Sequence, residues 1–238
     1  YSFDMLEKLK NLLLVNRNIR QTIAKNTFWL TVSNIGGRII RAVIIIYAAR
    51  ILGAASWGVF SYATSIAGLL TIFFDFGLNS VLTRETARAK TDFEKSEIIS
   101  TLFIIKLTLL VIGVMIIIFI APYLITIKEA VSLLPLVAVI MFFDTFREFG
   151  FSILRAREKM EIEATLYIVT NIAIVSSGLI LLFYSPTIIY FAWGYVIGSF
   201  IGAIATFYIL KDDFQKIFSH FSSKLVKPSL QTSWQLAA

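Results

Sequence analysis

The sequence contains no cysteine and a single histidine, His220, in 238 residues. Without cysteine the chain has no disulfide framework, no thiolate metal site and no cysteine nucleophile. One histidine is too few for a multi-histidine metal centre or a histidine-based catalytic set. The sequence also lacks a GxxxxGK[ST] loop, so ATP hydrolysis is not expected. We therefore expect no metal, no cofactor and no catalytic residues.

Charged residues are scarce as well. They make up 16% of the chain, against about a quarter in soluble globular proteins, while hydrophobic residues reach 58% and the mean hydropathy is +0.81. A soluble domain of this size could not bury so much apolar surface, so the composition indicates an integral membrane protein. In a membrane protein the net charge of +7 is explained first by lysines and arginines in the cytoplasmic loops. No nucleic acid partner is therefore expected.

Six apolar stretches are long enough to cross a hydrocarbon core of about 30 Å, which takes about 20 helical residues. Every backbone polar group needs an internal partner in lipid, and the runs lack the alternation of a barrel, so the stretches must be helices. The predicted fold class is an all-α integral membrane bundle of about six transmembrane helices, at residues 26–52, 59–83, 98–121, 130–154, 162–184 and 187–210.

The flanking segments complete the predicted organisation. Residues 1–25 form a cytoplasmic segment that is either an amphipathic helix on the inner leaflet or a charged lead-in to the first span. Residues 26–210 form the six-helix lobe, and 211–238 form a cytoplasmic linker and the start of a seventh span.

The lysines and arginines outside the predicted spans fall almost entirely on one side of the bundle. Sixteen of them lie in the N-terminal segment, the second and fourth loops and the tail, whereas the other three loops hold only Lys128. Positive residues remain cytoplasmic, so the chain is predicted to be a multi-pass protein of the cytoplasmic membrane with both termini inside.

Two arginines lie deep in the first span. Arg38 and Arg41 are 12 and 15 residues past Asn26, or about 18 and 22 Å along a helix, and a charged residue near the bilayer centre costs about 2.5–3.5 kcal/mol. Spacings of four, three, four and three residues place both on one polar helix face, formed by Thr27, Thr31, Asn34, Arg38 and Arg41. Either nearby acids neutralise these charges, or they face a wet cavity that binds an anion; we favour the cavity, with Asn34, Arg38 and Arg41 as substrate-binding candidates.

Acidic residues lie in two other spans. Asp75 is a candidate counter-ion for Arg38 and Arg41 or a candidate coupling-ion site, and the sequence alone does not distinguish these two roles. In the fourth span Asp144 and Glu148 are candidates for the same roles, and Asp144 can pair with Arg147 at i, i+3. Lys106 is expected to extend to the inner surface.

Two glycine features predict close helix packing. Gly194, Gly198 and Gly202 step by four residues and form a small-residue ridge in the sixth span, and Gly36 and Gly37 allow a bend or a close approach in the first.

Several short segments occur in a fixed order: ARILGAASWG at 49–58, FSYATSIAGLLTIFFDFG at 60–77, LNSVLTRETAR at 78–88 and RAREKMEIEA at 155–164. In this order they resemble the opening half of the Wzx-like polysaccharide biosynthesis flippases, which belong to the multidrug/oligosaccharidyl-lipid/polysaccharide exporter superfamily. The resemblance implies one lobe of a MATE-like transporter whose two six-helix lobes open alternately to each side. This chain has the length of the first lobe, so the C-terminal lobe would be missing.

The same resemblance implies a lipid-linked oligosaccharide as cargo, with a diphosphate that Arg38 and Arg41, and thirdly Arg147, would neutralise. Membrane lipids and polysaccharide assembly proteins are the expected further partners. Two other functions stay open. A cation-coupled multidrug exporter of the same superfamily would need acidic and aromatic cavity residues, and a membrane-bound glycosyltransferase would need an acidic site on a sizeable loop.

Overall fold

The computed structural model describes residues 19–217 and 220–237, and within them it contains helices and no strands. The predicted segment 1–25 lies mostly outside the described residues, which begin with the first turns of α2. The elements are α2 (Ile19–Asp75), α3 (Leu78–Arg88), α4 (Asp92–Met115), η1 (Ile116–Ile120), α5 (Ala121–Leu124), η2 (Lys128–Leu133), α6 (Leu134–Ala156), α7 (Met160–Tyr184), α8 (Ile188–Ile209), α9 (Lys211–Lys216) and α10 (Ser223–Ala237).

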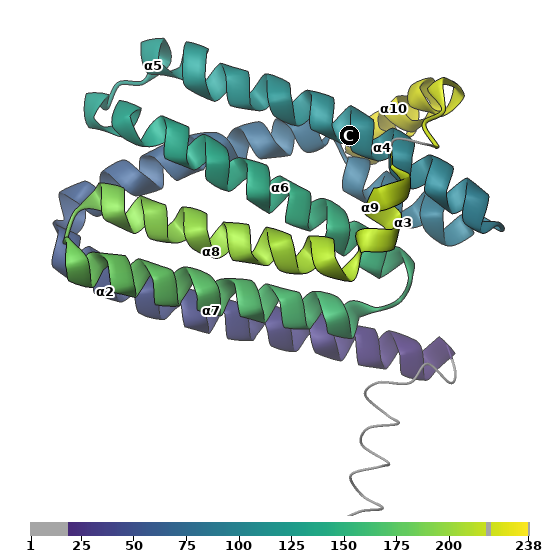
Figure 1. Cartoon of the computed structure of the whole chain (residues 1–238), viewed down its shortest axis with the longest axis horizontal. Helices are drawn as coiled ribbons and strands as arrows, with labels where there is room; N and C mark the ends of the chain where they lie inside the picture. The colour runs from purple at the N-terminus through teal and green to yellow at the C-terminus, as the bar shows by residue number, and fades with distance from the viewer. Residues whose placement is uncertain (1–18, 218–219, 238) are drawn as a thin grey trace, which may run out of the picture.

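Five helical segments of the described chain are long and apolar enough to cross a membrane. One of them, α2, has 57 residues, which at about 1.5 Å per residue is far longer than a bilayer is thick. It folds back at Gly53, whose φ of 78° and ψ of 161° interrupt the helix, and Figure 1 shows the two arms of α2 running in opposite directions. Glycine adopts such a positive φ without steric cost. The predicted all-α integral membrane bundle is confirmed, and each arm of α2 is long enough to cross the membrane once.

Local signals set other helix boundaries. Thr91 caps α4: its hydroxyl accepts from the Glu94 amide at 3.2 Å, and the Glu94 carboxylate accepts from the Thr91 amide at 3.3 Å. This reciprocal pair satisfies two amides at the start of the helix. Pro135 lies in the first turn of α6, where its missing N–H needs no partner.

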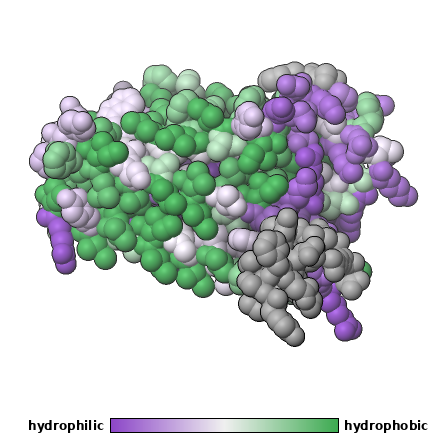
Figure 2. Space-filling view, turned by 60° about the horizontal axis from the view of Figure 1, so that its bottom comes forward, coloured by the Kyte–Doolittle hydropathy of each residue, from purple (hydrophilic) through white to green (hydrophobic). Residues whose placement is uncertain are grey.

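Polar side chains gather mainly at one end of the bundle, while apolar side chains cover most of its length (Figure 2). We call this the charged end; its ion pairs tie neighbouring helices together. Lys25 of α2 lies 3.1 Å from Glu161 of α7, and Arg155 at the end of α6 donates from Nε to both carboxylate oxygens of Glu163, each at 3.0 Å. At the opposite end, the short-loop end, the chain turns at Gly53 and at Ser185.

The Arg155–Glu163 pair gives a stability prediction. The Glu163 side chain is only 5% exposed, so Arg155→Met leaves a buried carboxylate without its cation and is expected to lower the free energy of unfolding by about 3–5 kcal/mol. Replacing both residues with methionine removes the charge and should recover most of the loss. Thermal unfolding in detergent measures both variants; equal stability of Arg155→Met and the wild type would contradict a structural role for the pair.

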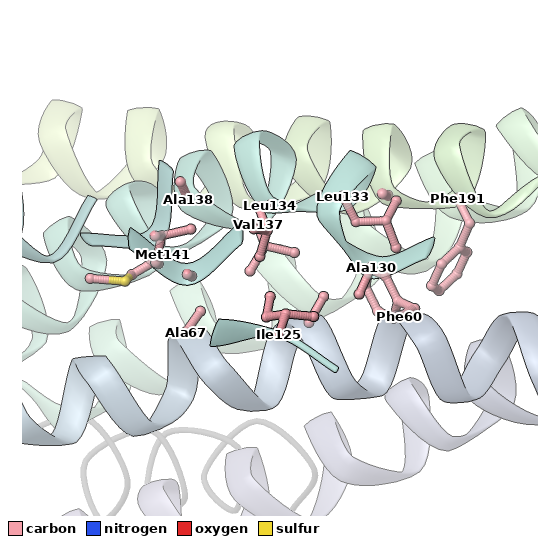
Figure 3. Packing of buried hydrophobic residues seen from close by; sticks show 14 of the residues in the cluster. Phe60, Ala67, Ile125, Ala130, Leu133, Leu134, Val137, Ala138, Met141 and Phe191 are labelled. Atoms are coloured by element: carbon pink, nitrogen blue, oxygen red, sulfur yellow. The ribbon is translucent and has the colours of Figure 1, made fainter. Parts of the chain in front are cut away.

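The apolar core near the short-loop end joins α6 to the second arm of α2. Buried residues of η2 and α6 recur every three or four positions and form one helix face, at Ala130, Leu133, Leu134, Val137, Ala138 and Met141. In Figure 3 this face packs over Phe60 and Ala67 of α2, with Phe191 of α8 beside it. These contacts fix the distance between the second arm of α2 and α6. Residues of these two helices and of α8 also line a pocket inside the bundle.

The glycine ridge of α8 packs directly on α7. A Cβ atom would lie 2.6 Å from the Gly178 Cα at Gly194 and 2.4 Å from the Ile174 Cα at Gly198. At Gly202 it would lie 2.3 Å from the Thr170 hydroxyl oxygen. The predicted packing role of this ridge is confirmed, because no other residue allows the two backbones to come so close.

Candidate functional site

The polar residues predicted for one face of the first arm of α2 do not all point in the same direction in the structure. Thr27, Thr31, Asn34 and Arg38 are exposed, while the buried face of this arm carries Ser33, Gly37, Ile44 and Ala48. Asn34 donates to the Leu30 carbonyl oxygen at 2.7 Å. Within the described part of the chain, Arg38 has no hydrogen bond and no ion pair. The structure therefore directs Arg38 and Asn34 away from the bundle.

Arg41 instead turns toward the inside of the bundle. Its Nε donates to Asn171 Oδ1 of α7 at 3.1 Å, and its guanidinium carbon lies 5.8 Å from the centroid of the Tyr195 ring of α8. The two helices approach closely at Gly37, where a Cβ would lie 2.3 Å from Tyr167 Cε1. The predicted close approach at this glycine is confirmed, and it brings the Arg41 side chain within reach of α7.

Arg41 lines a pocket of about 440 Å³, which we call the arginine pocket. Both arms of α2, together with α6 and α8, form its walls. Its polar lining residues are Arg41, Ser61, Thr64, Thr71, Asp144 and Tyr195, and Trp57, Phe60 and Phe191 are its aromatic residues. The pocket thus offers a guanidinium with free N–H groups beyond the bond to Asn171, several hydroxyls and one carboxylate.

Asp144 and Arg147 form the ion pair expected from their spacing. Arg147 Nη1 donates to Asp144 Oδ1 at 2.6 Å, and the Arg147 residue is 4% exposed. Its guanidinium carbon lies 5.8 Å from the Phe151 ring centroid, while its Nε is buried without a hydrogen-bond partner in the described residues. Asp144 faces the arginine pocket and Arg147 lies behind it, so the structure makes Arg147 the counter-ion of a pocket carboxylate.

Asp75 pairs with Lys106 of α4, and not with Arg38 or Arg41. Lys106 is 6% exposed and also donates to Asn79 Oδ1 at 3.2 Å. The expectation that Lys106 extends to the surface is therefore wrong. The reason is that the ammonium group finds a carboxylate and an amide inside the bundle, on a neighbouring segment.

The same region corrects the predicted second span, 59–83, which is not one continuous helix. Helix α2 ends at Asp75 and α3 begins at Leu78, because Phe76 and Gly77 adopt left-handed φ angles of 42° and 73°. The sequence signal for this break is Gly77, which follows Asp75 and Phe76 within an apolar run.

A second pocket, of about 580 Å³, surrounds this break, and we call it the break pocket. It is lined by Asp75, Asn79, Lys106, Thr145 and Glu148, and by the aromatic residues Phe73, Phe76 and Trp234. Glu148 lies here with its side chain 40% exposed and a carboxylate oxygen 4.0 Å from Arg155. Thr71 lines both pockets, so the two cavities adjoin along α2.

The described residues contain no group of three or more carboxylate or imidazole side chains that could hold a metal ion. The sequence profile of a family described as Polysaccharide biosynthesis protein matches residues 23–238. The chain belongs to this family. Membership in the polysaccharide biosynthesis protein family confirms the resemblance of the sequence motifs and supports a flippase or export role in polysaccharide synthesis.

The members of this family are transporters or flippases rather than enzymes. Together with the five long apolar helices, membership makes the chain a multi-pass membrane protein. No curated protein and no solved structure matches the sequence.

Proposed function

We propose that this chain is the N-terminal lobe of a flippase that moves a lipid-linked oligosaccharide across the cytoplasmic membrane by alternating access. The observation that carries the proposal is Arg41, which lines a pocket inside the bundle with Arg38 one turn before it on the exposed face of the same helix. In this arrangement the charged end of the bundle is cytoplasmic, because lysine and arginine remain on that side.

The depth of Arg41 suits a transport site. Arg41 precedes the turn at Gly53 by 12 residues, which places it about 18 Å from the short-loop end, near the middle of a hydrocarbon core about 30 Å thick. A sugar diphosphate loses its water in hydrocarbon at a high cost in free energy. A hydrated pocket with a cation and hydroxyl groups lowers that cost for the head group, while the lipid tail remains in the bilayer.

The exposure of Arg38 supports a second lobe. An arginine on a lipid-facing surface at this depth costs about 2.5–3.5 kcal/mol, so the exposed face with Asn34 and Arg38 fits a water-filled cleft between this lobe and a partner lobe. Rocking of the two lobes against each other would then open the cleft to each side in turn, as in other transporters built from repeats.

Transport by the full-length protein in reconstituted vesicles tests the proposal. We expect a lipid-linked oligosaccharide to move between leaflets at a rate well above that in protein-free vesicles, and an excess of organic cation to leave this rate unchanged. Movement of the organic cation alone would instead indicate a multidrug exporter. Transfer of the sugar to an acceptor, with no movement of the lipid-linked donor, would indicate a glycosyltransferase.

A further inference from the structure

The break between α2 and α3 has the features of a ligand site. Phe76 has a φ of 42°, a conformation that is strained for a side chain of this size and that clusters at functional positions. The last carbonyl groups of α2 lose the partners that a continuing helix would provide. The break lines the break pocket, because Asp75, Phe76 and Gly77 are among the lining residues.

The polar groups of the break pocket include both donors and acceptors. The Lys106 ammonium joins the Asp75 carboxylate and the Asn79 amide oxygen in one hydrogen-bonded group. Thr145 is 6% exposed and lines the pocket, and its hydroxyl oxygen has no hydrogen-bond partner in the described chain. A ligand rich in hydroxyl groups can accept from and donate to these groups at the same time.

Two aromatic rings accompany these polar groups. The ring centroids of Phe76 and Trp234 lie 6.3 Å apart with an interplanar angle of 35°, and both residues line the pocket. Trp234 of α10 is 66% exposed, so its ring is accessible. The negative faces of aromatic rings attract the weakly positive C–H groups on the face of a sugar ring.

The formal charge of the break pocket differs from that of a phosphate site. Asp75 and Glu148 outnumber Lys106, which leaves one net negative charge among the lining residues. A diphosphate would be repelled by these carboxylates at short range. In the arginine pocket Arg41 offsets the single carboxylate, Asp144, which is also paired with Arg147. The diphosphate therefore fits the arginine pocket better, and the break pocket fits an uncharged group.

We propose that the break pocket is a sugar-binding subsite, which holds the first one or two sugar units of the cargo while the arginine pocket holds the diphosphate. This inference rests on the proposed function. The two subsites adjoin at Thr71, as the sugar and the diphosphate adjoin in the cargo. The volume of about 580 Å³ lies in the range of small-molecule sites, about 300–1,000 Å³.

Binding to the full-length protein in detergent tests the subsite, with three probes: a lipid-linked oligosaccharide, the same polyprenyl diphosphate without sugar, and an organic cation. We expect the double variant W234A/E148Q to bind the lipid-linked oligosaccharide at least about 10-fold more weakly. Its affinity for the sugar-free diphosphate should stay within about twofold of the wild type. Trp234→Phe keeps an aromatic ring and should retain most of the affinity. Trp193→Ala, on the exposed surface of α8, is the matched tryptophan control and should change neither affinity.

The outcomes separate this inference from the proposed function. Equal losses for both diphosphate probes in W234A/E148Q, or no loss for either, would overturn the sugar subsite while leaving the flippase intact. Tighter binding of the organic cation than of the oligosaccharide, lost in the same double variant, would also overturn it. Failure of the wild-type protein to bind either diphosphate probe would instead contradict the proposed function.

Discussion

Replacing Arg38 and Arg41 together with alanine is expected to reduce translocation of a lipid-linked oligosaccharide at least about 100-fold. A hydrogen bond to a charged group contributes about 1.5–3 kcal/mol, and each 1.4 kcal/mol corresponds to about a tenfold change. Loss of two such contacts with a diphosphate therefore gives a factor of about 100 or more. The assay is movement of the labelled lipid between the leaflets of vesicles that contain the full-length protein.

The double variant should still fold. Arg38 is exposed, and Arg41 makes a single hydrogen bond with a neighbouring helix, to Asn171. Arg41→Lys keeps the positive charge without the planar fork, so it should fall between the wild type and the double variant. Lys128→Ala removes a cation from the short-loop end and should leave translocation unchanged. Unchanged translocation in the double variant, with normal expression and insertion, would contradict a cationic transport site.

Replacing Gly198 with alanine is expected to destabilise the lobe by about 3 kcal/mol or more, at the upper end of the effects of overpacking. The added Cβ would lie 2.4 Å from the Ile174 Cα and 2.5 Å from the Ile174 backbone nitrogen. Since the nearest atoms belong to the backbone of α7, no side-chain rotation can relieve the contact. The helices would have to separate along the ridge that joins α7 to α8.

Gly36→Ala is the matched control for this change, because it makes the same substitution in another membrane-spanning helix. A Cβ at Gly36 would have no atom within 4 Å outside the local backbone, and alanine is a better helix former than glycine by about 0.8–1.0 kcal/mol. Thermal unfolding in detergent should show a large loss for Gly198→Ala and no loss for Gly36→Ala. Similar curves for the two variants would contradict the close packing of α7 and α8.

Much of the fold was predictable because it depends on local composition. The lengths of the apolar runs in the predicted bundle follow from bilayer thickness. The Asp144–Arg147 pair follows from helix periodicity, since residues three apart are neighbours on a helix surface. The glycine ridge of α8 was recognisable for the same reason.

The predictions failed where contacts join segments that are distant in the sequence. Lys106 and Asp75 lie on different helices, and only the packing of α4 against the end of α2 brings them together. The periodicity of the first span placed Arg38 and Arg41 on one polar face, yet three residues turn a helix by about 300°, so their directions differ by about 60°. That difference decides which arginine reaches Asn171 and which remains exposed.

The central claim, that the arginine pocket receives the head group of the cargo, is tested most directly by site-specific photo-crosslinking. A photoreactive residue at Thr64, which lines the arginine pocket, should crosslink to a lipid-linked oligosaccharide, and excess unlabelled polyprenyl diphosphate should suppress the product. The same residue at Leu69, which is 58% exposed and lines neither pocket, should give only the background of ordinary lipid. Equal crosslinking at the two positions, insensitive to the competitor, would contradict the claim.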